Sequence, residues 1–177
     1  LVGQTFPGHD TLSLADFDGD GHPDVVGATY SGLSTSLGDG NGGFGPATIL
    51  PGGQFYSVAT ADFDGDGNQD VAATSVGSVS ILLGDGSGGF GSPSGTSTSC
   101  CSVSLAVADF NGDGHADVVT VDPIQNLAYV ALGDGAGNLG TAISISVGSG
   151  PYVVRGLDVN EDGQADLEVM DQATDKI

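Results

Sequence analysis

Short apolar runs alternate with acidic and glycine-rich stretches along the whole chain. An apolar run such as "YSVATADF" or "SVSLAVADF" precedes each acidic stretch, and a second run such as "DVVGATY" follows it. A third run, such as "SVSILL", precedes each glycine-rich stretch, and a weaker polar run such as "FGPATIL" follows. These runs are rich in Val, Ile, Thr and Ser and bounded by Gly, Asp and Pro, as strands are. No stretch has helical periodicity. The pattern therefore predicts four short strands per unit.

The units are repeats of one another. "ADFDGDGHPDVV" returns as "ADFDGDGNQDVA", "ADFNGDGHADVV" and "LDVNEDGQADLE", with first loop aspartates about 46, 47 and 49 residues apart. A second motif keeps the same rhythm as "LGDGNGGFG", "LGDGSGGFG" and "LGDGAGNLG". Four short strands in a unit of about 45 residues are typical of a β-propeller blade.

We therefore predict an all-β fold, a β-propeller-type repeat array of four-stranded antiparallel blades. The single repeat domain, 1–177, holds about four repeats. Three complete blades are expected at about 12–56, 57–103 and 104–152. The fourth is split between 153–177 and an N-terminal strand at 1–8. In an up-and-down sheet, the acidic loop (between the first and second strands) and the glycine turn (between the third and fourth) lie at the same end.

The acidic loop has the composition of a calcium site. Counted from its first Asp, positions 1, 3 and 5 are Asp or Asn, position 6 is Gly and position 9 is Asp in all four units. Ca²⁺ takes oxygen ligands, the Gly permits a sharp turn, and the backbone carbonyl of position 7 adds a further oxygen. Because no His or Cys side chain stands at a ligand position, Ca²⁺ is favoured over Zn²⁺ or Cu²⁺. Up to four ions are expected, held by Asp16, Asp18, Asp20, His22, Asp24, Asp62, Asp64, Asp66, Asn68, Asp70, Asp109, Asn111, Asp113, His115, Asp117, Asp158, Asn160, Asp162, Gln164 and Asp166.

Two other interpretations of the loop fit less well. An EF-hand needs a bidentate Glu at position 12 and flanking helices, but that position is Gly27, Ala73, Thr120 or Val169 and the flanks predict strands. A simple turn explains Asp and Gly, but it does not need an Asp at position 9 inside an apolar strand. Loops three and four have Asn at position 3, and loop four has Glu161 at position 4, which weakens their prediction.

Overall composition narrows the function classes. The chain has 177 residues, 38% of them hydrophobic, which is enough for a folded core. Its net charge of −21, with only 2 Lys and Arg residues, argues against nucleic-acid binding and favours cations. No apolar run reaches the roughly 20 residues of a membrane span, so no membrane insertion is expected.

The glycine motif predicts a hairpin turn and not a phosphate-binding loop, because strands flank both sides and no Lys is near. Its aspartates are expected to bond the turn backbone. Its apolar residue is expected to pack between blades, and the Phe after the first loop Asp to lie in the core. These three sets are Asp39, Asp85 and Asp134; Phe44, Phe90 and Leu139; and Phe17, Phe63 and Phe110.

"DFDGDGHPD" with the paired "GDGNGGFG" resembles the FG-GAP/VCBS-type repeat, which also builds the calcium-binding propellers of integrin α subunits and of some fungal lectins. The resemblance covers nearly the whole chain. It implies one propeller blade per repeat and Ca²⁺ bound through positions 1, 3, 5, 7 and 9 of each acidic loop. It also implies an extracellular role in adhesion, ligand binding or assembly. Propellers of this family usually close with about seven blades, so this chain departs from the pattern in repeat number.

The function expected from these features is a non-catalytic, extracellular or cell-surface calcium-binding module for adhesion or for binding a protein or glycan. One alternative is a structural subunit that assembles with copies of itself by pairing open strand edges; another is a lectin. Catalysis is not expected, because nearly every clustered carboxylate belongs to a repeated loop; a pocket that holds non-repeat carboxylates such as Asp122 or Asp171 would favour it.

The contact surface is expected at the end of the blades opposite the acidic loops. Aromatic residues predicted to lie there suit sugar or protein contacts. The adjacent cysteines form either a vicinal disulfide or two free thiols, and the sequence leaves both open. The candidate ligand-binding residues are Tyr30, Phe55, Tyr56, Cys100, Cys101 and Tyr152.

Overall fold

The computed structural model describes residues 11–98 and 102–171. Within these residues it contains fourteen strands and no helix, so none that could cross a membrane. The predicted strand at 1–8 and the Cys100–Cys101 pair lie outside the described residues.

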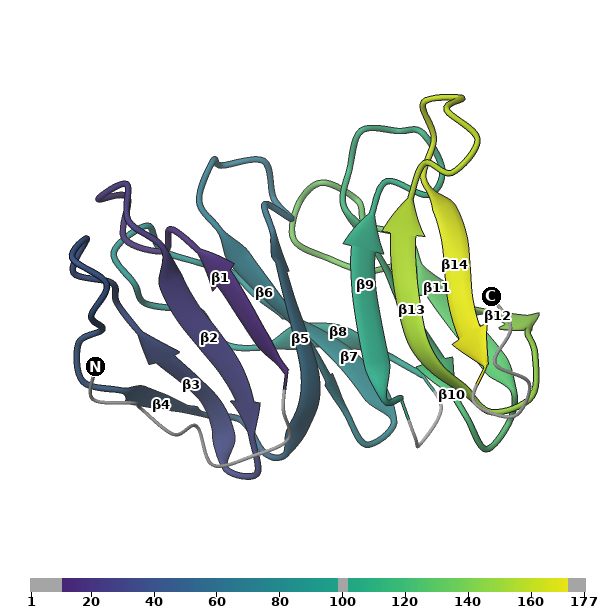
Figure 1. Cartoon of the computed structure of the whole chain (residues 1–177), viewed down its shortest axis with the longest axis horizontal. Helices are drawn as coiled ribbons and strands as arrows, with labels where there is room; N and C mark the ends of the chain where they lie inside the picture. Colours follow the sequence, from purple (N-terminus) through teal and green to yellow (C-terminus); the bar gives the residue numbers. More distant parts are fainter. Residues whose placement is uncertain (1–10, 99–101, 172–177) are drawn as a thin grey trace.

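Three four-stranded antiparallel sheets and one two-stranded sheet follow one another along the chain (Figure 1). In each sheet the strands are neighbours in chain order, which confirms the predicted up-and-down blades. Their bounds are β1 (Leu12–Ala15), β2 (Asp24–Thr29), β3 (Gly32–Ser36) and β4 (Thr48–Pro51); β5 (Phe55–Ala61), β6 (Asp70–Ser75), β7 (Ser78–Leu82) and β8 (Ser94–Ser97); β9 (Ser104–Ala108), β10 (Asp117–Asp122), β11 (Leu127–Ala131) and β12 (Ile143–Ser146); and β13 (Pro151–Leu157) and β14 (Asp166–Asp171).

The second and fourth sheets begin slightly earlier than the expected blade boundaries at 57 and 153. β5 begins at Phe55 and β13 at Pro151, so Tyr56 and Tyr152 belong to the second and fourth sheets. In both strands the pairing register shifts just after the first residue. That first residue pairs with the last residue of the neighbouring second strand.

Burial follows the position of each strand in its sheet. The second strands β2, β6 and β10 are buried along almost their whole length, because a strand flanks each edge and the following sheet packs against them. The fourth strands β4, β8 and β12 are largely exposed. The short, exposed fourth strands therefore form the outer rim, as in propeller blades.

Neighbouring sheets pack through three hydrophobic clusters. The first joins Phe17, Val26 and Leu33 of the first sheet to Val58 and Val71 of the second. The other two clusters join the second sheet to the third and the third to the fourth. Each cluster packs around the first strand of the following sheet, because β5, β9 and β13 each contact the sheet before them.

The phenylalanines that follow the first loop Asp are core residues, as predicted: Phe17 and Phe63 are buried, and Phe110 packs against the third cluster. Phe90 and Leu139 of the glycine turns pack between sheets. The same prediction is wrong for Phe44, whose surface is 44% exposed. The reason is that no sheet precedes the first one in the described part of the chain.

Candidate metal centres

The acidic loops and the glycine turns lie at the same end of the sheets, as the sequence predicts (Figure 1). The aspartate at position 9 connects the two in every complete sheet. Asp24 begins β2, is fully buried, and accepts the Phe17 N–H at 2.7 Å and the Gly38 N–H at 2.7 Å. One oxygen therefore bonds the acidic loop and the other bonds the glycine turn.

The same pair of hydrogen bonds recurs in the next two sheets. Asp70 accepts the Phe63 N–H and the Gly84 N–H, each at 2.7 Å. Asp117 accepts the equivalent N–H groups of Phe110 at 2.9 Å and Gly133 at 2.8 Å. Burial raises the pKa of Asp70 and of Asp117, although these N–H donors oppose the shift.

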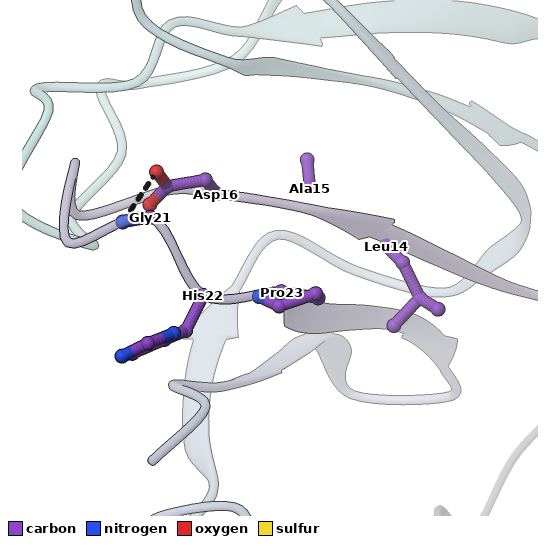
Figure 2. A pocket seen from close by; sticks show the side chains of 6 residues that line it. All are labelled: Leu14, Ala15, Asp16, Gly21, His22 and Pro23. Carbon is purple, nitrogen blue, oxygen red and sulfur yellow. Dashed lines mark hydrogen bonds between the residues drawn. The ribbon is translucent and has the colours of Figure 1, made fainter. Parts of the chain in front are cut away.

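The first loop aspartate folds the loop around itself. Asp16 accepts the Gly19 N–H at 2.8 Å through Oδ1 and the Gly21 N–H at 2.9 Å through Oδ2 (Figure 2). Asp18 and Asp20 each accept the N–H two residues further on. These Asx-type bonds hold alternate carboxylates on the inside of the turn.

Three carboxylates meet in each of the first two loops. One oxygen from each of Asp16, Asp18 and Asp24 lies within 4.8 Å of the others. Asp62, Asp64 and Asp70 form the same triad in the second loop. These are positions 1, 3 and 9. Asp20 and Asp66, at position 5, lie outside these triads and instead accept N–H bonds from His22 and Asn68.

The donor set of these triads fits a hard cation. All the donors are carboxylate oxygens, which suit Ca²⁺ better than soft metals. The chain holds only 2 Lys and Arg against 23 Asp and Glu residues, so the protein supplies little positive charge of its own. Asp18 also has a raised pKa, from desolvation first and then from its acidic neighbours.

Loops three and four have an asparagine at position 3, where the first two loops have an aspartate. The side-chain amides of Asn111 and Asn160 donate to the position 5 carboxylates Asp113 and Asp162, at 2.9 Å and 3.0 Å. In loop three, the N–H of Gly114 lowers the pKa of Asp109. A neutral amide at position 3 lowers the negative charge available to a cation.

Loop four also has a strained backbone. Glu161 has a φ of 61°, whereas the equivalent Gly112 of loop three has a φ of 77°. A non-glycine residue in this left-handed region costs free energy. Asp166, at position 9, accepts the Val159 N–H at 3.0 Å and lies in the two-stranded fourth sheet.

The histidine rings stay outside the carboxylate triads. Both His22 and His115 are exposed. Figure 2 shows the His22 ring turned away from the Asp16 carboxylate, beside a pocket that is also lined by Leu14 and Pro23. The ring lies over Gly40 of the glycine turn, where a side chain would clash with it. The His22 ring therefore lies against the glycine turn and not in the carboxylate triad.

The aspartates of the glycine turns bond the turn backbone, as predicted. Asp39 accepts the N–H groups of Asn41 and Gly43, and these bonds lower its pKa. Asp85 accepts from Ser87 and Gly89, and Asp134 from Ala136 and Asn138. The pKa of each is lowered, chiefly by the Ser87 hydroxyl and by the Asn138 side-chain amide.

The candidate ligand-binding tyrosines belong to three different sheets. Tyr30 is exposed in the β2–β3 turn. Tyr56 lies in β5, where its carbonyl accepts the Thr11 hydroxyl at 3.0 Å. The hydroxyl of Tyr152 donates to the sulfur of Met170 at 3.0 Å.

Sequence reasoning missed two residues that share the position of Tyr30. Val76 and Ile124 are exposed in the equivalent turns between the second and third strands of their sheets. A single exposed apolar residue is ordinary. The signal available in the sequence was an apolar or aromatic residue within two positions of the end of the second strand in the first three repeats.

Asp122 and Asp171, two carboxylates outside the repeated loops, lie buried at the ends of β10 and β14. Asp122 accepts the N–H groups of Ile124 and Gln125 at 2.7 Å and 3.0 Å. Its carboxylate therefore caps the β10–β11 turn.

Comparison with solved structures finds three proteins of similar fold. A lectin of Agrocybe aegerita, solved for its specific recognition of non-reducing terminal N-acetylglucosamine, is 26% identical, with a TM-score of 0.67 over 89% of this chain and 45% of the lectin chain. The Tc holotoxin pore of Photorhabdus luminescens is 19% identical, with a TM-score of 0.56 over 94% of this chain and 9% of its own. The V. cholerae biofilm matrix protein Bap1 is 22% identical, with a TM-score of 0.53 over 93% of this chain and 28% of its own.

The last two similarities concern the fold alone. The chain spans less than half the length of each of these three proteins. No curated protein matches it. The model of the FG-GAP-like repeat matches three overlapping stretches, residues 16–73, 62–120 and 109–169. Each stretch begins at one acidic loop and ends just after the next one. The matches therefore follow one another with the same spacing as the sheets. The chain belongs to the FG-GAP-like repeat family.

Proposed function

We propose that this chain is a non-catalytic, calcium-stabilised binding module that acts outside the cell, with a glycan or a protein as its ligand. The observation that most directly supports calcium is the pair of carboxylate triads in the first two loops. Bound Ca²⁺ supplies charge compensation and extra bonds between loop residues. Asp16, Asp18 and Asp24 would hold it in loop one, and Asp62, Asp64 and Asp70 in loop two.

Backbone hydrogen bonds within the loop orient the carboxylates of such a site. Backbone N–H groups already orient the carboxylates of Asp16 and Asp24. Because Asp24 also bonds Gly38, a cation at this triad would stiffen both the acidic loop and the glycine turn. We therefore expect a bound cation to stabilise the whole end of the sheet that carries the acidic loop and the glycine turn.

Calorimetric titration of the calcium-depleted chain tests this proposal. We expect saturable calcium binding, and we expect Asp18→Ala and Asp64→Ala each to lower the stoichiometry by one site. The matched control is Asp39→Ala, which removes an exposed carboxylate at the same end that lies outside the triads. An unchanged stoichiometry in both triad variants would refute the assignment.

The ligand surface is proposed at the opposite end, where the turns between second and third strands present Tyr30, Val76 and Ile124. The lectin relative supports a glycan as one ligand class, because it shares 26% identity and the fold with this chain. A glycan array and a pull-down from extracellular matrix proteins test the two classes. Tyr30→Ser combined with Ile124→Ser is expected to abolish binding, and Phe44→Ser, an exposed change on the first sheet, to leave it unchanged.

The chain is proposed to be non-catalytic because its carboxylates accept hydrogen bonds from the backbone. Those at positions 1 and 9 bond the loop backbone in each repeat, and Asp122 caps a turn. The lectin relative agrees with a binding role. Secretion of the native protein, followed with an antibody against this chain, tests the location.

A further inference from the structure

The acidic loops differ at one of their four side-chain positions, which are 1, 3, 5 and 9. Position 3 is Asp18 in loop one and Asp64 in loop two, but Asn111 in loop three and Asn160 in loop four. The backbone beside it is the same in the first three loops, because the glycine at position 4 has a φ of 74°, 76° and 77° in turn. A comparison of these three loops therefore isolates the effect of one side chain.

In loops one and two, the aspartate at position 3 bonds the loop through one oxygen. Oδ1 of Asp18 accepts the Asp20 N–H at 3.2 Å, and Oδ1 of Asp64 accepts the Asp66 N–H at 3.1 Å. Among residues 11–98 and 102–171, Oδ2 of Asp18 and Oδ2 of Asp64 accept no hydrogen bond. Both aspartates belong to the carboxylate triads, so each triad includes a residue with an oxygen free for a cation.

In loops three and four, the backbone uses the only side-chain oxygen of the asparagine. Oδ1 of Asn111 accepts the Asp113 N–H at 2.9 Å, which is the bond that the aspartates also make. This bond fixes the orientation of the amide, because only its oxygen can accept from an N–H group. The amide nitrogen takes the place of the second oxygen and donates to Oδ2 of Asp113 at 2.9 Å. Asn160 makes the same two bonds to Asp162, at 2.9 Å and 3.0 Å.

The remaining carboxylates of loop three are fully bonded. Each of the six oxygens at positions 1, 5 and 9 accepts a hydrogen bond from the loop or from the glycine turn. Loop two is intermediate, because the Asn68 amide donates to Asp66 while Oδ2 of Asp64 has no donor in the described part of the chain. Amide hydrogens carry positive partial charge, so the Asn111 amide offsets part of the carboxylate charge that a cation would offset.

We propose that position 3 selects the loops that take Ca²⁺: loops one and two each bind an ion, and the asparagine amide replaces the ion in loops three and four. This inference rests on the proposed calcium binding, and it narrows the four expected ions to two. An Asn oxygen can be a ligand of Ca²⁺. In loop three, however, that oxygen accepts the Asp113 N–H, and an ion beside it would meet the amide hydrogens. Calcium therefore stabilises the first two sheets and has little effect on the other two.

Calorimetric titration of the calcium-depleted full chain counts the ions. We expect two for the unmodified chain. Exchanging the side chains of loops two and three should change the count in opposite directions: Asn111→Asp should add one site and Asp64→Asn should remove one. Asn41→Asp is the matched control, because it adds the same charge at an exposed position in the first glycine turn; the count should stay at two.

Hydrogen exchange followed by mass spectrometry locates the ions. Calcium should slow exchange of the amide hydrogens in residues 16–24 and 62–70 and leave residues 109–117 unchanged. In the Asn111→Asp chain, calcium should slow exchange in 109–117 as well. Three or four ions in the unmodified chain, or slowed exchange in its residues 109–117, would overturn the selection by position 3. An Asn111→Asp chain that still binds two ions would also overturn it.

Melting curves in chelator test the amide without calcium. Asp64→Asn adds an amide donor beside Asp66 and should raise the melting temperature by about 2–4 °C, and Asn111→Asp removes one and should lower it by a similar amount. Shifts of the opposite sign would overturn the role of the amide. No calcium binding by any of these chains would refute the proposed function itself, so the two failures are distinguishable.

Discussion

The Gly38 N–H group donates a hydrogen bond of 2.7 Å to Oδ1 of Asp24, across a sequence separation of 14 residues. Because the other oxygen of Asp24 accepts the Phe17 N–H, one buried carboxylate joins the acidic loop to the glycine turn. This arrangement gives the aspartate at position 9 a structural role that is separate from any cation.

Asp70→Ala tests that structural role. The substitution leaves the buried N–H group of Phe63 and the partly buried N–H group of Gly84 without their acceptor. Hydrogen bonds to charged groups are worth about 1.5–3 kcal/mol each, so we expect the free energy of unfolding to fall by about 3 kcal/mol. Urea unfolding is measured with a chelator present, so that loss of calcium does not contribute. Asp66→Ala is the control, because Asp66 is exposed and its loss should have a small effect; equal losses would contradict the assigned role.

Calcium removal is expected to lower the melting temperature. A ligand that binds only the folded state at 100 times its dissociation constant adds about 2.7 kcal/mol per site. Differential scanning calorimetry in excess calcium and in excess chelator measures the shift. Asp18→Ala combined with Asp64→Ala should reduce it, because the first two triads are then incomplete. Identical curves for the unmodified chain under both conditions would refute calcium stabilisation.

Glu161→Gly is expected to stabilise the chain. Glu161 has a φ of 61°, in a region that costs a non-glycine residue about 1 kcal/mol or more. The matched opposite change is Gly112→Ala in loop three, where φ is 77° and a destabilisation of similar size is expected. Melting temperatures with chelator present provide the comparison. A lower melting temperature for Glu161→Gly would show that the Glu side chain contributes more than the strain removes.

Phe90 and Phe44 occupy the same position in two glycine turns but differ in burial. Phe90 packs on Phe17 of the preceding sheet, whereas Phe44 is exposed. Phe90→Ala is expected to cost about 2–3 kcal/mol of folding free energy, because it opens a cavity between sheets. Phe44→Ala should cost much less. Equal losses in urea unfolding would contradict the packing between sheets.

Asp85 gives the chain a defined acid sensitivity. Bonds from the Ser87 hydroxyl and from the N–H groups of Ser87 and Gly89 lower its pKa. The carboxylate's contribution is therefore complete above the ordinary aspartate value of about 3.9 and is lost as the pH falls through the lower folded value. Asp85→Asn should be less stable than the unmodified chain at pH 7. The difference in melting temperature should shrink toward the acid end; a constant difference would show that charge is not involved.

Much of this fold could be predicted from the sequence because the determinants are local and repeated. The period of about 46 residues fixed the number of sheets, and the Asx and glycine positions defined the acidic loop. Phe44 shows where such reasoning fails. Its neighbours in sequence match those of Phe90, but its burial depends on a preceding sheet, which a local pattern does not contain.

The sequence predicts the carboxylates of the candidate metal site but not the hydrogen bonds that join separate motifs. Positions 1, 3 and 9 converge in the first two loops, but the sequence does not reveal that Asp20 bonds the His22 N–H and lies outside the triad. The hydrogen bonds from Gly38 to Asp24 and from Gly88 to Phe17 were also missed, because they join separate motifs. They follow from the register of the strands and from the packing of one sheet on the next.

The bond from each glycine turn to the phenylalanine of the preceding repeat gives the row of sheets a polarity. Gly88 reaches back to Phe17 and Gly137 reaches back to Phe63, so every link has the same direction. The two outer faces of the row are therefore different surfaces: the first sheet presents a turn with its Phe44 exposed, and the third and fourth sheets present a pocket lined by Phe110, Leu132 and Asp166. Repeats joined in this way add head to tail, and a repeat inserted in the reverse orientation would meet no matching anchor.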